Sequence, residues 1–489
     1  MQAPAGLRWS AHPMPETSRN GLSFVIVGAS GDLARNKIVP ALFALFCQGY
    51  LPDRFCIIGF ARTAWNDDEF RKSIEPHLTC RYVPGERCAQ LMRDFLGRCH
   101  YVPGQYGSVD SFLELFQCMR RVECTPRSDR IFYMSVPPFL FLDVARAIGN
   151  AGLLTCGEKG PWSRVVIEKP FGRDRASSDE LVANVSQVFS EDDTYRIDHY
   201  LGKEVIQNLL VLRFANLVFE PIWNSTFIET VRISWKEDIG VGGRGGYFNQ
   251  YGVIRDVIQN HLAQILALVA MEPPQSFRSQ DVSAAKTALL NAVAPADPAN
   301  WTIGQYDGYL DEPGIPEGSI TPTFAAGSLR VNNARWQGVP FFIDAGKGLN
   351  ERVTEIRIRF RPTQCCKAIE KSAGPLPPNE LVIRVQPDEL IRLGIVNKVP
   401  GLEMKLAQTW LNLAYKSAFQ APIPEAYECL LLDIMQGDRS LFITREELAA
   451  AWDIFTPLLH ELEARRAAPE IYPFGTRGVE LPHAPMEEK

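Results

Sequence analysis

The feature that most restricts the fold is a strand, glycine turn and helix pattern near the start of the chain. Residues 22–28 (LSFVIVG) form an apolar, β-branched run, which is typical of a strand buried on both faces of a parallel sheet. Gly28, Gly31 and Ala34 follow with GxxGxxA spacing, and a helical pattern then begins. Glycines at such a turn let the backbone approach a pyrophosphate at a helix N-terminus. The segment predicts a dinucleotide site, although an ordinary strand–helix turn has the same spacing.

Strand and helix patterns alternate through about the first 200 residues. Further apolar strands are expected at residues 54–62, 130–138 and 163–172, each with helical stretches before or after it. Alternation of this kind indicates parallel strands joined by helical crossovers. We therefore predict an α/β, Rossmann-type doubly wound domain over residues 21–198, after a disordered lead-in at residues 1–20.

The pattern changes after Tyr200. Residues 201–223 are expected to form one long helix. Period-two strands are then expected at residues 227–238, 323–333, 339–347, 354–360, 379–387 and 402–407. In the segment TEIRIRF, apolar and charged residues alternate, which is typical of an antiparallel sheet with one covered face. The second domain, residues 199–489, is therefore predicted to be α+β with a large, mainly antiparallel sheet.

The composition argues against several classes of protein. With a net charge of −6, the chain lacks the positive excess typical of proteins that bind nucleic acids. It contains no run of ~20 apolar residues, so no membrane span is expected. The seven histidines show no HExxH-like spacing, so no metal site is predicted. The eleven cysteines include no CxxC pair, which predicts free thiols in a reducing compartment.

The end of the second strand indicates which dinucleotide binds. Sheets that bind NAD place there an Asp or Glu that binds the ribose 2′-hydroxyl, whereas an Arg accepts a 2′-phosphate. In this chain Arg62 occupies that end, and no carboxylate follows it before Asp67. Ser30 in the glycine loop is a further donor. These residues favour NADP, while an ordinary surface cation remains the alternative for Arg62.

Two later segments carry charged side chains suited to an anionic substrate. Lys169 follows a predicted buried strand, so it is expected at the crevice along the carboxyl edge of the sheet. In the segment YRIDHYLGKE, a helix beginning at Asp198 would place His199 and Lys203 on one face. Tyr200 and the unpaired helix N–H groups would lie beside them. The cluster predicts a binding site for a phosphate group. The alternative is that these residues are the charged, solvent-exposed start of a helix.

His261 is the candidate general base. It lies in a predicted helix over residues 253–271, next to an apolar stripe, so a hydrogen-bonded core histidine is the alternative. Asp256 lies about 140° away around an α-helix, so spacing alone does not make these two residues partners. Asp198 would repel a phosphate, and it is better suited to be the partner of an imidazole.

Beyond these local patterns, the chain resembles the glucose-6-phosphate dehydrogenase family from about Leu22 to its final helices. The matching segments, in order, are GASGDLA, FAR, VIEKPFGRD, RIDHYLGKE, IQNLLVLRFAN, GRGGYF, IRDVIQNHLAQ, GKGLNER and NELVIRVQP. The resemblance implies oxidation of D-glucose 6-phosphate at C1 by NADP⁺, which gives 6-phospho-D-glucono-1,5-lactone and NADPH in the first step of the pentose phosphate pathway. A dehydrogenase of another sugar or polyol, and a non-catalytic NADP-binding protein, are the alternatives.

The resemblance also implies roles for individual residues. His261 would be the general base, and Asp198 would orient it. The substrate would be bound by Lys169, His199, Tyr200, Lys203, Glu237, Asp256, Lys347, Arg352 and Gln386. NADP would be bound by Gly28, Ser30, Gly31, Asp32, Leu33, Lys37, Arg62 and Lys169. Some family members hold a second, structural NADP⁺, and Arg357 and Arg384 match that site whereas Asp344 departs from it. A homodimer or homotetramer built on the large sheet, located in the cytoplasm, is expected.

Overall fold

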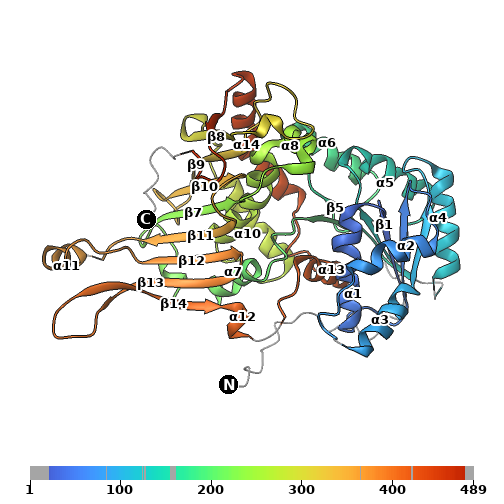
Figure 1. Ribbon diagram of the computed structural model, residues 1–489, viewed down its shortest axis with the longest axis horizontal. Coiled ribbons are helices and arrows are strands. Elements are labelled where there is room, and N and C mark those ends of the chain that lie inside the picture. Colours follow the sequence, from blue (N-terminus) through green and yellow to red (C-terminus); the bar gives the residue numbers. More distant parts are fainter. Residues whose placement is uncertain are drawn as a thin grey trace.

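The computed structural model describes residues 21–83, 85–123, 125, 128–154, 161–363, 365–419 and 422–479. The predicted lead-in at residues 1–20 lies outside these described residues. Within them the chain forms two sheets that lie side by side, each with its own set of helices (Figure 1). The two sheets use successive parts of the chain, and the predicted change of pattern after Tyr200 falls between them.

The first sheet is parallel throughout and confirms the predicted doubly wound fold. Its strand order is β3-β2-β1-β4-β5-β6. The strands are β1 Gly21–Val27, β2 Phe55–Ala61, β3 Cys99–Pro103, β4 Ser128–Met134, β5 Ser163–Glu168 and β6 Thr194–Ile197. The sequence patterns miss β3 and β6, which have only five and four residues. The strand order reverses between β1 and β4, and ligands of such sheets bind at that point, outside the carboxyl ends of the strands.

Helices follow the strands of this sheet, as crossover connections between parallel strands require (Figure 1). They are η1 Ala34–Ile38, α1 Val39–Cys47, α2 Asp67–Ile74, η2 Glu75–His77, α3 Glu86–Leu96, α4 Val109–Val122, η3 Pro138–Leu140, α5 Phe141–Asn150 and α6 Arg175–Ser186. Side chains fix two of the helix starts. Asn66 and Glu69 form a reciprocal capping box at α2, and Asp174 and Ser177 do the same at α6.

The second sheet is large and mainly antiparallel, which confirms the predicted α+β class. Its strand order is β14-β13-β12-β11-β7-β10-β9-β8-β15, and only the β7–β10 and β8–β15 pairs are parallel. The strands are β7 Ile228–Lys236, β8 Trp301–Tyr306, β9 Phe324–Arg330, β10 Pro340–Gly346, β11 Val353–Phe360, β12 Glu380–Gln386, β13 Leu390–Lys398, β14 Leu406–Ala414 and β15 Glu470–Tyr472. The strand predicted over residues 402–407 is wrong, because β14 begins only at Leu406.

Helices pack on this sheet and connect it to the first one. They are α7 Glu204–Phe214, η4 Glu220–Ile222, η5 Gly242–Arg244, α8 Gly245–Val253, η6 Ile254–Leu262, α9 Ala263–Ala270, α10 Ser279–Ala292, η7 Pro298–Asn300, η8 Tyr309–Asp311, α11 Cys366–Ala373, α12 Tyr415–Ala418, α13 Ala426–Gln436 and α14 Arg445–Ala464. The single long helix predicted over residues 201–223 is wrong. Helix α7 ends at Phe214, and the Asn216 side-chain amide donates to the carbonyl oxygens of Val211 and Leu212. Pro221 then lies in a separate short turn.

The last helices return to the first half of the molecule. Helix α13 packs on α1, and α14 packs on α6 as well as on α10 (Figure 1). Arg164 on β5 donates to the carbonyl oxygens of Ile434 and Met435 at the end of α13, at 2.5 and 3.0 Å. The late segments of the chain therefore join the two sheets, and the carboxyl ends of β5 and β6 lie at this junction.

The prediction that all cysteines are free thiols is wrong for one pair. Cys80 and Cys88 form a disulfide with a Cα–Cα distance of 5.8 Å. Their spacing of eight residues spans the loop that leads into α3, which a search for CxxC pairs does not detect. Cys56, Cys99 and Cys118 are buried and form no disulfide, as predicted. Every helix in the described ranges is too short or too polar to traverse a lipid bilayer.

Candidate active site

The segment YRIDHYLGKE does not enter a helix at Asp198, so this prediction is wrong. Strand β6 ends one residue earlier, and a series of turns follows. Leu201 N–H donates to the Asp198 carbonyl oxygen at 3.0 Å, and Lys203 N–H donates to that of Tyr200 at 3.1 Å. The Asp198 carboxylate also accepts the Tyr200 N–H at 2.9 Å, which holds the turn closed. Helix α7 begins only at Glu204, and the charged side chains leave a compact turn instead of one helix face.

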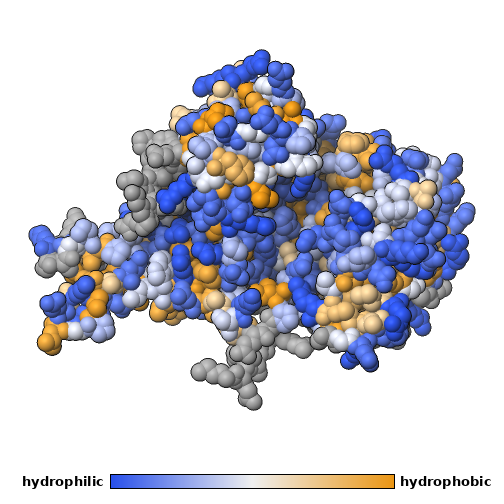
Figure 2. Space-filling view, viewed as in Figure 1, coloured by the Kyte–Doolittle hydropathy of each residue, from blue (hydrophilic) through white to orange (hydrophobic). Residues whose placement is uncertain are grey.

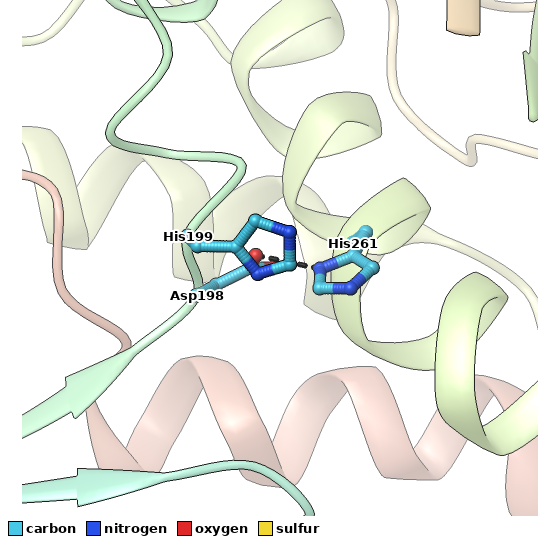
Figure 3. A group of neighbouring side chains, drawn as sticks. All are labelled: Asp198, His199 and His261. Atoms are coloured by element: carbon cyan, nitrogen blue, oxygen red, sulfur yellow. Dashed lines mark hydrogen bonds and ion pairs between the residues drawn. The ribbon is translucent and has the colours of Figure 1, made fainter. Parts of the chain in front are cut away.

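Asp198 and His261 form a buried pair at the centre of the junction (Figure 3). The His261 Nδ1 atom lies 2.6 Å from the Asp198 Oδ1 atom, and the two side chains are only 3% and 2% exposed. Burial opposes the ionisation of Asp198, but attraction to His261 outweighs it and holds the Asp198 pKa at about 2. Burial lowers the pKa of His261, while Asp198 opposes that shift. The imidazole is therefore neutral at neutral pH, with its Nδ1–H donating to the carboxylate.

The helix that carries His261 has an unexpected pitch. Residues Ile254–Leu262 form a π-helix, η6, which begins after a kink at Gly252 with φ of +65°. In a π-helix residues five apart lie one above the other, because the hydrogen bonds run from residue i to residue i+5. Asp256 and His261 are five apart and so face the same way, whereas the spacing of an α-helix separates them. Even so, the carboxylate that bonds to His261 is that of Asp198, and Asp256 and His261 meet only through Lys169.

Lys169 joins the two halves of the site. It follows β5, and its ammonium group donates to the Asp256 carboxylate at 2.9 Å and to the Asp256 carbonyl oxygen at 2.8 Å. The same nitrogen lies 3.0 Å from His261 Nε2, the ring nitrogen that Asp198 leaves free. Burial opposes the ionisation of Asp256, but attraction to Lys169 outweighs it and holds the Asp256 pKa at about 2. The ammonium group thus bridges a carboxylate and the candidate base.

Tyr200 supports the imidazole from one side. Its ring stacks on His261, with ring centroids 4.4 Å apart and an angle of 29° between the planes. Its hydroxyl is buried and accepts from Trp235 Nε1 at 2.6 Å and from Gln386 Nε2 at 3.2 Å, with Thr354 Oγ1 at 3.3 Å. Gln386 thus donates one N–H to Tyr200, and its amide oxygen and second N–H are not used in this bond.

Cationic side chains gather beside this core. The ring of His199 contacts that of His261 edge-on, with centroids 4.8 Å apart. The Lys203 ammonium lies 5.3 Å from the centre of the Tyr200 ring. Burial lowers the pKa of Lys203, Glu389 opposes the shift by attraction, and Arg352 and Lys37 add to it by repulsion. The predicted phosphate-binding residues thus converge, although they come from two separate segments of the chain, residues 199–203 and the segment that contains Arg352.

Glu237 and Lys347 form a second ion pair, at 2.5 Å. Glu237 directly follows β7 and Lys347 directly follows β10, and these two strands are parallel neighbours. The carboxyl ends of parallel neighbours lie at the same edge of a sheet. This pairing explains why two residues far apart in the sequence meet on the large-sheet side of the site. The Lys347 ammonium also lies 5.3 Å from the Trp235 ring, which places the pair close to Tyr200.

The glycine loop fits a dinucleotide. Gly28 has φ of +95°, and a Cβ atom there would lie 2.2 Å from the Ser135 carbonyl oxygen, so only glycine suits the position. Ser30 Oγ accepts from the Thr63 hydroxyl at 2.9 Å, which ties the loop to the segment after β2. Arg62 is exposed, and its guanidinium lies 5.4 Å from the centre of the Tyr106 ring. A bare backbone turn and a free cation therefore lie together at the carboxyl edge of β1 and β2.

The other predicted coenzyme residues lie on or beside the same loop. Asp32 is exposed and pairs with Arg35 at 2.8 Å, and Leu33 is half-buried. Lys37 pairs with Glu425, which directly precedes α13, at 3.3 Å. The loop is thus in contact with the segment that returns from the second half of the chain.

Asp198, His199 and His261 are the one group, within the ranges the structure describes, whose ligand atoms could surround a metal ion. These atoms lie within 4.8 Å of one another (Figure 3). Both ring nitrogens of His261 already have partners, however, and one of those partners is the Lys169 ammonium. A fixed cation 3.0 Å from a nitrogen opposes a metal ion there. The group suits the transfer of a proton better than the binding of a metal.

Three residues that the sequence analysis does not assign lie beside Lys169. The Tyr133 and Tyr427 hydroxyls both donate to Glu168 Oε1, at 2.5 and 3.1 Å. Glu168 could be noticed in sequence as the first residue of the EKP segment. No sequence pattern relates the two tyrosines, because they lie on β4 and α13, far apart in the chain.

Comparison with known proteins identifies two adjacent regions. A family model described as "Glucose-6-phosphate dehydrogenase, NAD binding domain" matches residues 25–208, and one described as "Glucose-6-phosphate dehydrogenase, C-terminal domain" matches residues 210–489. The chain is 49% identical over 469 residues to the chloroplastic glucose-6-phosphate 1-dehydrogenase of Spinacia oleracea, covering 94% of this chain and 81% of that protein. It is 44% identical over 473 residues to the cytoplasmic glucose-6-phosphate 1-dehydrogenase 5 of Arabidopsis thaliana, covering 95% and 90%.

Solved structures give the same result. The structure titled "Glucose-6-phosphate dehydrogenase in complex with its substrate glucose-6-phosphate" superposes with a TM-score of 0.86 at 40% sequence identity. The match covers 94% of this chain and 95% of that one. Both sheets and the junction between them are therefore shared with that protein.

Proposed function

The chain belongs to the glucose-6-phosphate dehydrogenase family, and from this premise we infer that it oxidises D-glucose 6-phosphate at C1 with NADP⁺. The products are 6-phospho-D-glucono-1,5-lactone and NADPH, and the reaction is the first step of the pentose phosphate pathway. The observation that carries the proposal is the buried Asp198–His261 pair at the junction of the two sheets, with its free ring nitrogen turned toward Lys169.

His261 is the general base in this proposal. Its Nε2 atom takes the proton of the C1 hydroxyl while the C1–H bond breaks, and the C1–O bond becomes the carbonyl of the lactone. The hydride acceptor would be supplied by NADP⁺ when it is bound. The neutral state of the buried imidazole leaves it able to take a proton, and Asp198 stabilises the imidazolium that forms. A positioned base of this kind contributes typically ~10²–10⁴-fold to the rate.

Lys169 has two tasks in this scheme. In the structure its ammonium group donates to His261 Nε2, so the C1 hydroxyl has to take its place before the proton can move. The bond to Asp256 holds Lys169 beside His261 while that exchange occurs, where it would contact both the sugar and the bound coenzyme. An ammonium group beside C1 also stabilises the negative charge that develops on the oxygen as its proton leaves.

The substrate's phosphate group is assigned to the cationic cluster. Lys203 and Arg352 supply positive charge, and Tyr200 borders them. Burial lowers the pKa of His199 well below its usual range, so this imidazole is a neutral hydrogen-bonding partner for the phosphate group. The sugar hydroxyls are assigned to Lys169, Glu237, Asp256, Lys347 and Gln386. Because Glu237 and Lys347 already pair with each other, each offers a fixed donor or acceptor instead of a side chain that must be ordered on binding.

NADP is assigned to the glycine loop and to the end of β2. Gly28 and Gly31 would let the backbone approach the pyrophosphate closely, and Ser30, Asp32, Leu33 and Lys37 would border it. Arg62 provides the cation for the 2′-phosphate, and its exposed guanidinium has no carboxylate partner among the ion pairs of the described residues.

NADPH formation tests this proposal directly. The purified chain is assayed with glucose 6-phosphate, glucose and other sugar phosphates, with either NADP⁺ or NAD⁺. The expected result is rapid NADPH formation with glucose 6-phosphate and NADP⁺ only. If an unphosphorylated sugar or polyol is oxidised equally well, the assignment of the cationic cluster is wrong.

We also propose that residues 21–198 form the coenzyme-binding domain and residues 199–489 the substrate-binding and oligomerisation domain. A homodimer or homotetramer through the large sheet is proposed because β14 is an edge strand of that sheet. Leu402, Met404 and Leu411 on the β13–β14 hairpin are exposed, and apolar residues gather at this projecting end of the sheet (Figure 2). Light scattering coupled to size-exclusion chromatography measures the mass of the assembly.

The proposed location is the cytoplasm. The relatives described above include one protein named cytoplasmic and one named chloroplastic, so the similarity alone favours neither compartment. Fractionation of source cells, followed by an activity assay of each fraction, distinguishes the two.

A further inference from the structure

Helix α13 is fixed to the coenzyme half of the molecule and also borders the phosphate-binding turn. The Glu428 carboxylate on α13 accepts from Tyr82 at 2.6 Å and pairs with Arg81. On its other side the helix lies against Gly202 of the turn, where a Cβ atom would come within 2.5 Å of the Ala426 carbonyl oxygen. The start of α13 is thus packed between the two parts of the site.

Tyr427 is the residue at this end of α13 that points into the site. Its side chain is buried, and its hydroxyl donates to Glu168 Oε1 at 3.1 Å. The Tyr133 hydroxyl donates to the same oxygen at 2.5 Å. Burial raises the pKa of Glu168, and the two hydroxyl groups together with Lys169 oppose that shift. Two donors that converge on one buried carboxylate oxygen fix its position, and the next residue along the chain is Lys169.

The ring of Tyr427 meets the substrate side of the site. It is parallel to the His199 ring, with an angle of 5° between the planes and 6.4 Å between the centroids. His199 in turn contacts His261 edge-on. One tyrosine therefore reaches Lys169 through the hydroxyl and Glu168, and reaches His199 through its ring.

We propose that Tyr427 is a positioning residue that aligns Lys169 through Glu168 and supports His199 with its ring. The proposal rests on the reaction inferred above. It divides the side chain into two parts with different effects. The hydroxyl acts on the step in which the proton leaves for His261, because Glu168 directly precedes Lys169 in the chain and the Lys169 ammonium lies 3.0 Å from His261 Nε2. The ring acts on binding of the phosphate group, because it borders His199.

Two variants separate these effects. Tyr427→Phe keeps the ring and removes the hydroxyl, so kcat should fall roughly tenfold while KM for glucose 6-phosphate changes by less than about twofold. Tyr427→Ala removes both, so a rise of roughly fivefold or more in that KM should be added to the fall in kcat. Tyr195→Phe is the control, because Tyr195 on β6 is also buried but packs on Phe442. This variant should match the wild-type enzyme in both constants.

Tyr133→Phe tests the shared oxygen independently. It removes the other donor to Glu168 and should also lower kcat without changing KM. In the double variant with Tyr427→Phe, kcat should fall by more than the product of the two single effects, because the buried carboxylate then loses its last hydroxyl donor. This cycle and Tyr427→Phe decide the matter even if Tyr427→Ala does not fold.

The wild-type assay separates the two levels of inference. Absence of NADPH formation from glucose 6-phosphate by the wild-type chain would contradict the proposed function itself. If the wild type is active but kcat is unchanged in Tyr427→Phe and in Tyr133→Phe, only the positioning role is wrong. A purely structural role would lower the melting temperature of the phenylalanine variants and leave their kcat per folded enzyme unchanged.

Discussion

Replacement of Asp198 by asparagine tests the catalytic pair most directly. The change keeps the size of the side chain and removes its charge, 2.6 Å from the His261 Nδ1 atom. Opposite charges whose centres are about 4 Å apart attract by about 4 kcal/mol at an effective dielectric constant of about 20. That attraction stabilises the imidazolium in the transition state, and 4 kcal/mol corresponds to about 10³-fold in rate. The asparagine oxygen can still accept a hydrogen bond from the Nδ1–H, which retains part of the stabilisation of the imidazolium. We therefore expect kcat to fall by a factor between about 10² and 10³.

The pH dependence of kcat gives a second, independent readout. Burial lowers the pKa of His261, and the charge of Asp198 is the main effect that opposes it. Without that charge the pKa of the base falls further, so the acidic limb of the kcat profile should move to lower pH in Asp198→Asn. KM for glucose 6-phosphate should change little, because neither residue belongs to the cationic cluster.

A matched control is available on the loop before β6. Asp192 has a side chain that is 94% exposed and pairs with Arg439 at 2.9 Å, so Asp192→Asn should leave kcat and its pH profile unchanged. The reasoning is refuted if Asp198→Asn keeps kcat within about threefold of the wild type, far less than a positioned base and its partner contribute. The reasoning is also refuted if the acidic limb of the kcat profile moves to higher pH, because the Asp198 carboxylate would then not be the group that opposes the lowering of the His261 pKa.

Three further predictions concern the groups around the catalytic pair. Lys203→Ala should raise KM for glucose 6-phosphate roughly tenfold or more but leave KM for glucose unchanged, and equal effects on both would contradict a phosphate grip. Arg62→Ala should raise KM for NADP⁺ roughly tenfold and spare that for NAD⁺, whereas parallel losses would mean that Arg62 is only structural. Burial raises the pKa of Glu389 to about 7, although attraction to Lys203 opposes this shift. The Glu389 carboxylate therefore gains its negative charge as the pH rises through about 7, and the charged form should repel the substrate phosphate. KM for glucose 6-phosphate measured from pH 6 to pH 9 should therefore rise above pH 7 in the wild type but not in Glu389→Gln, and identical profiles would exclude the effect.

The parallel sheet could be predicted from sequence because its central strands are long and mainly apolar. Strands β1, β2 and β4 are buried on both faces, and each contains an apolar run in its sequence, although β4 begins with three polar residues. Strand β11 could be predicted for the opposite reason, because its period-two pattern reflects one covered face. Edge strands such as β3 could not, because a short strand with partly exposed residues has neither signal.

The contacts of the site depend on long-range packing, which local patterns do not contain. Lys169 follows β5, Asp198 follows β6 and His261 lies on η6, and only the packing of η6 against the junction brings them together. The matching segments of the family implied their roles without any geometry. The disulfide between Cys80 and Cys88 also could not be predicted from local sequence, because the two cysteines are eight residues apart and form no CxxC pair.

The pitch of η6 is the one local feature whose misassignment changes the chemistry. With α-helical spacing Asp256 and His261 would lie about 140° apart around the helix axis. With π-helical spacing both face Lys169, and the ammonium group is shared between a carboxylate and a neutral imidazole. The Asp256 carboxylate balances the positive charge of Lys169. The Lys169 ammonium can therefore lie 3.0 Å from His261 Nε2 and donate a hydrogen bond to it. When a hydroxyl displaces Lys169 from Nε2, Asp256 still holds the ammonium group, which leaves the base free and the cation beside the reacting oxygen. The unusual helix thus places the base, the cation and its counter-ion within one hydrogen-bonded group.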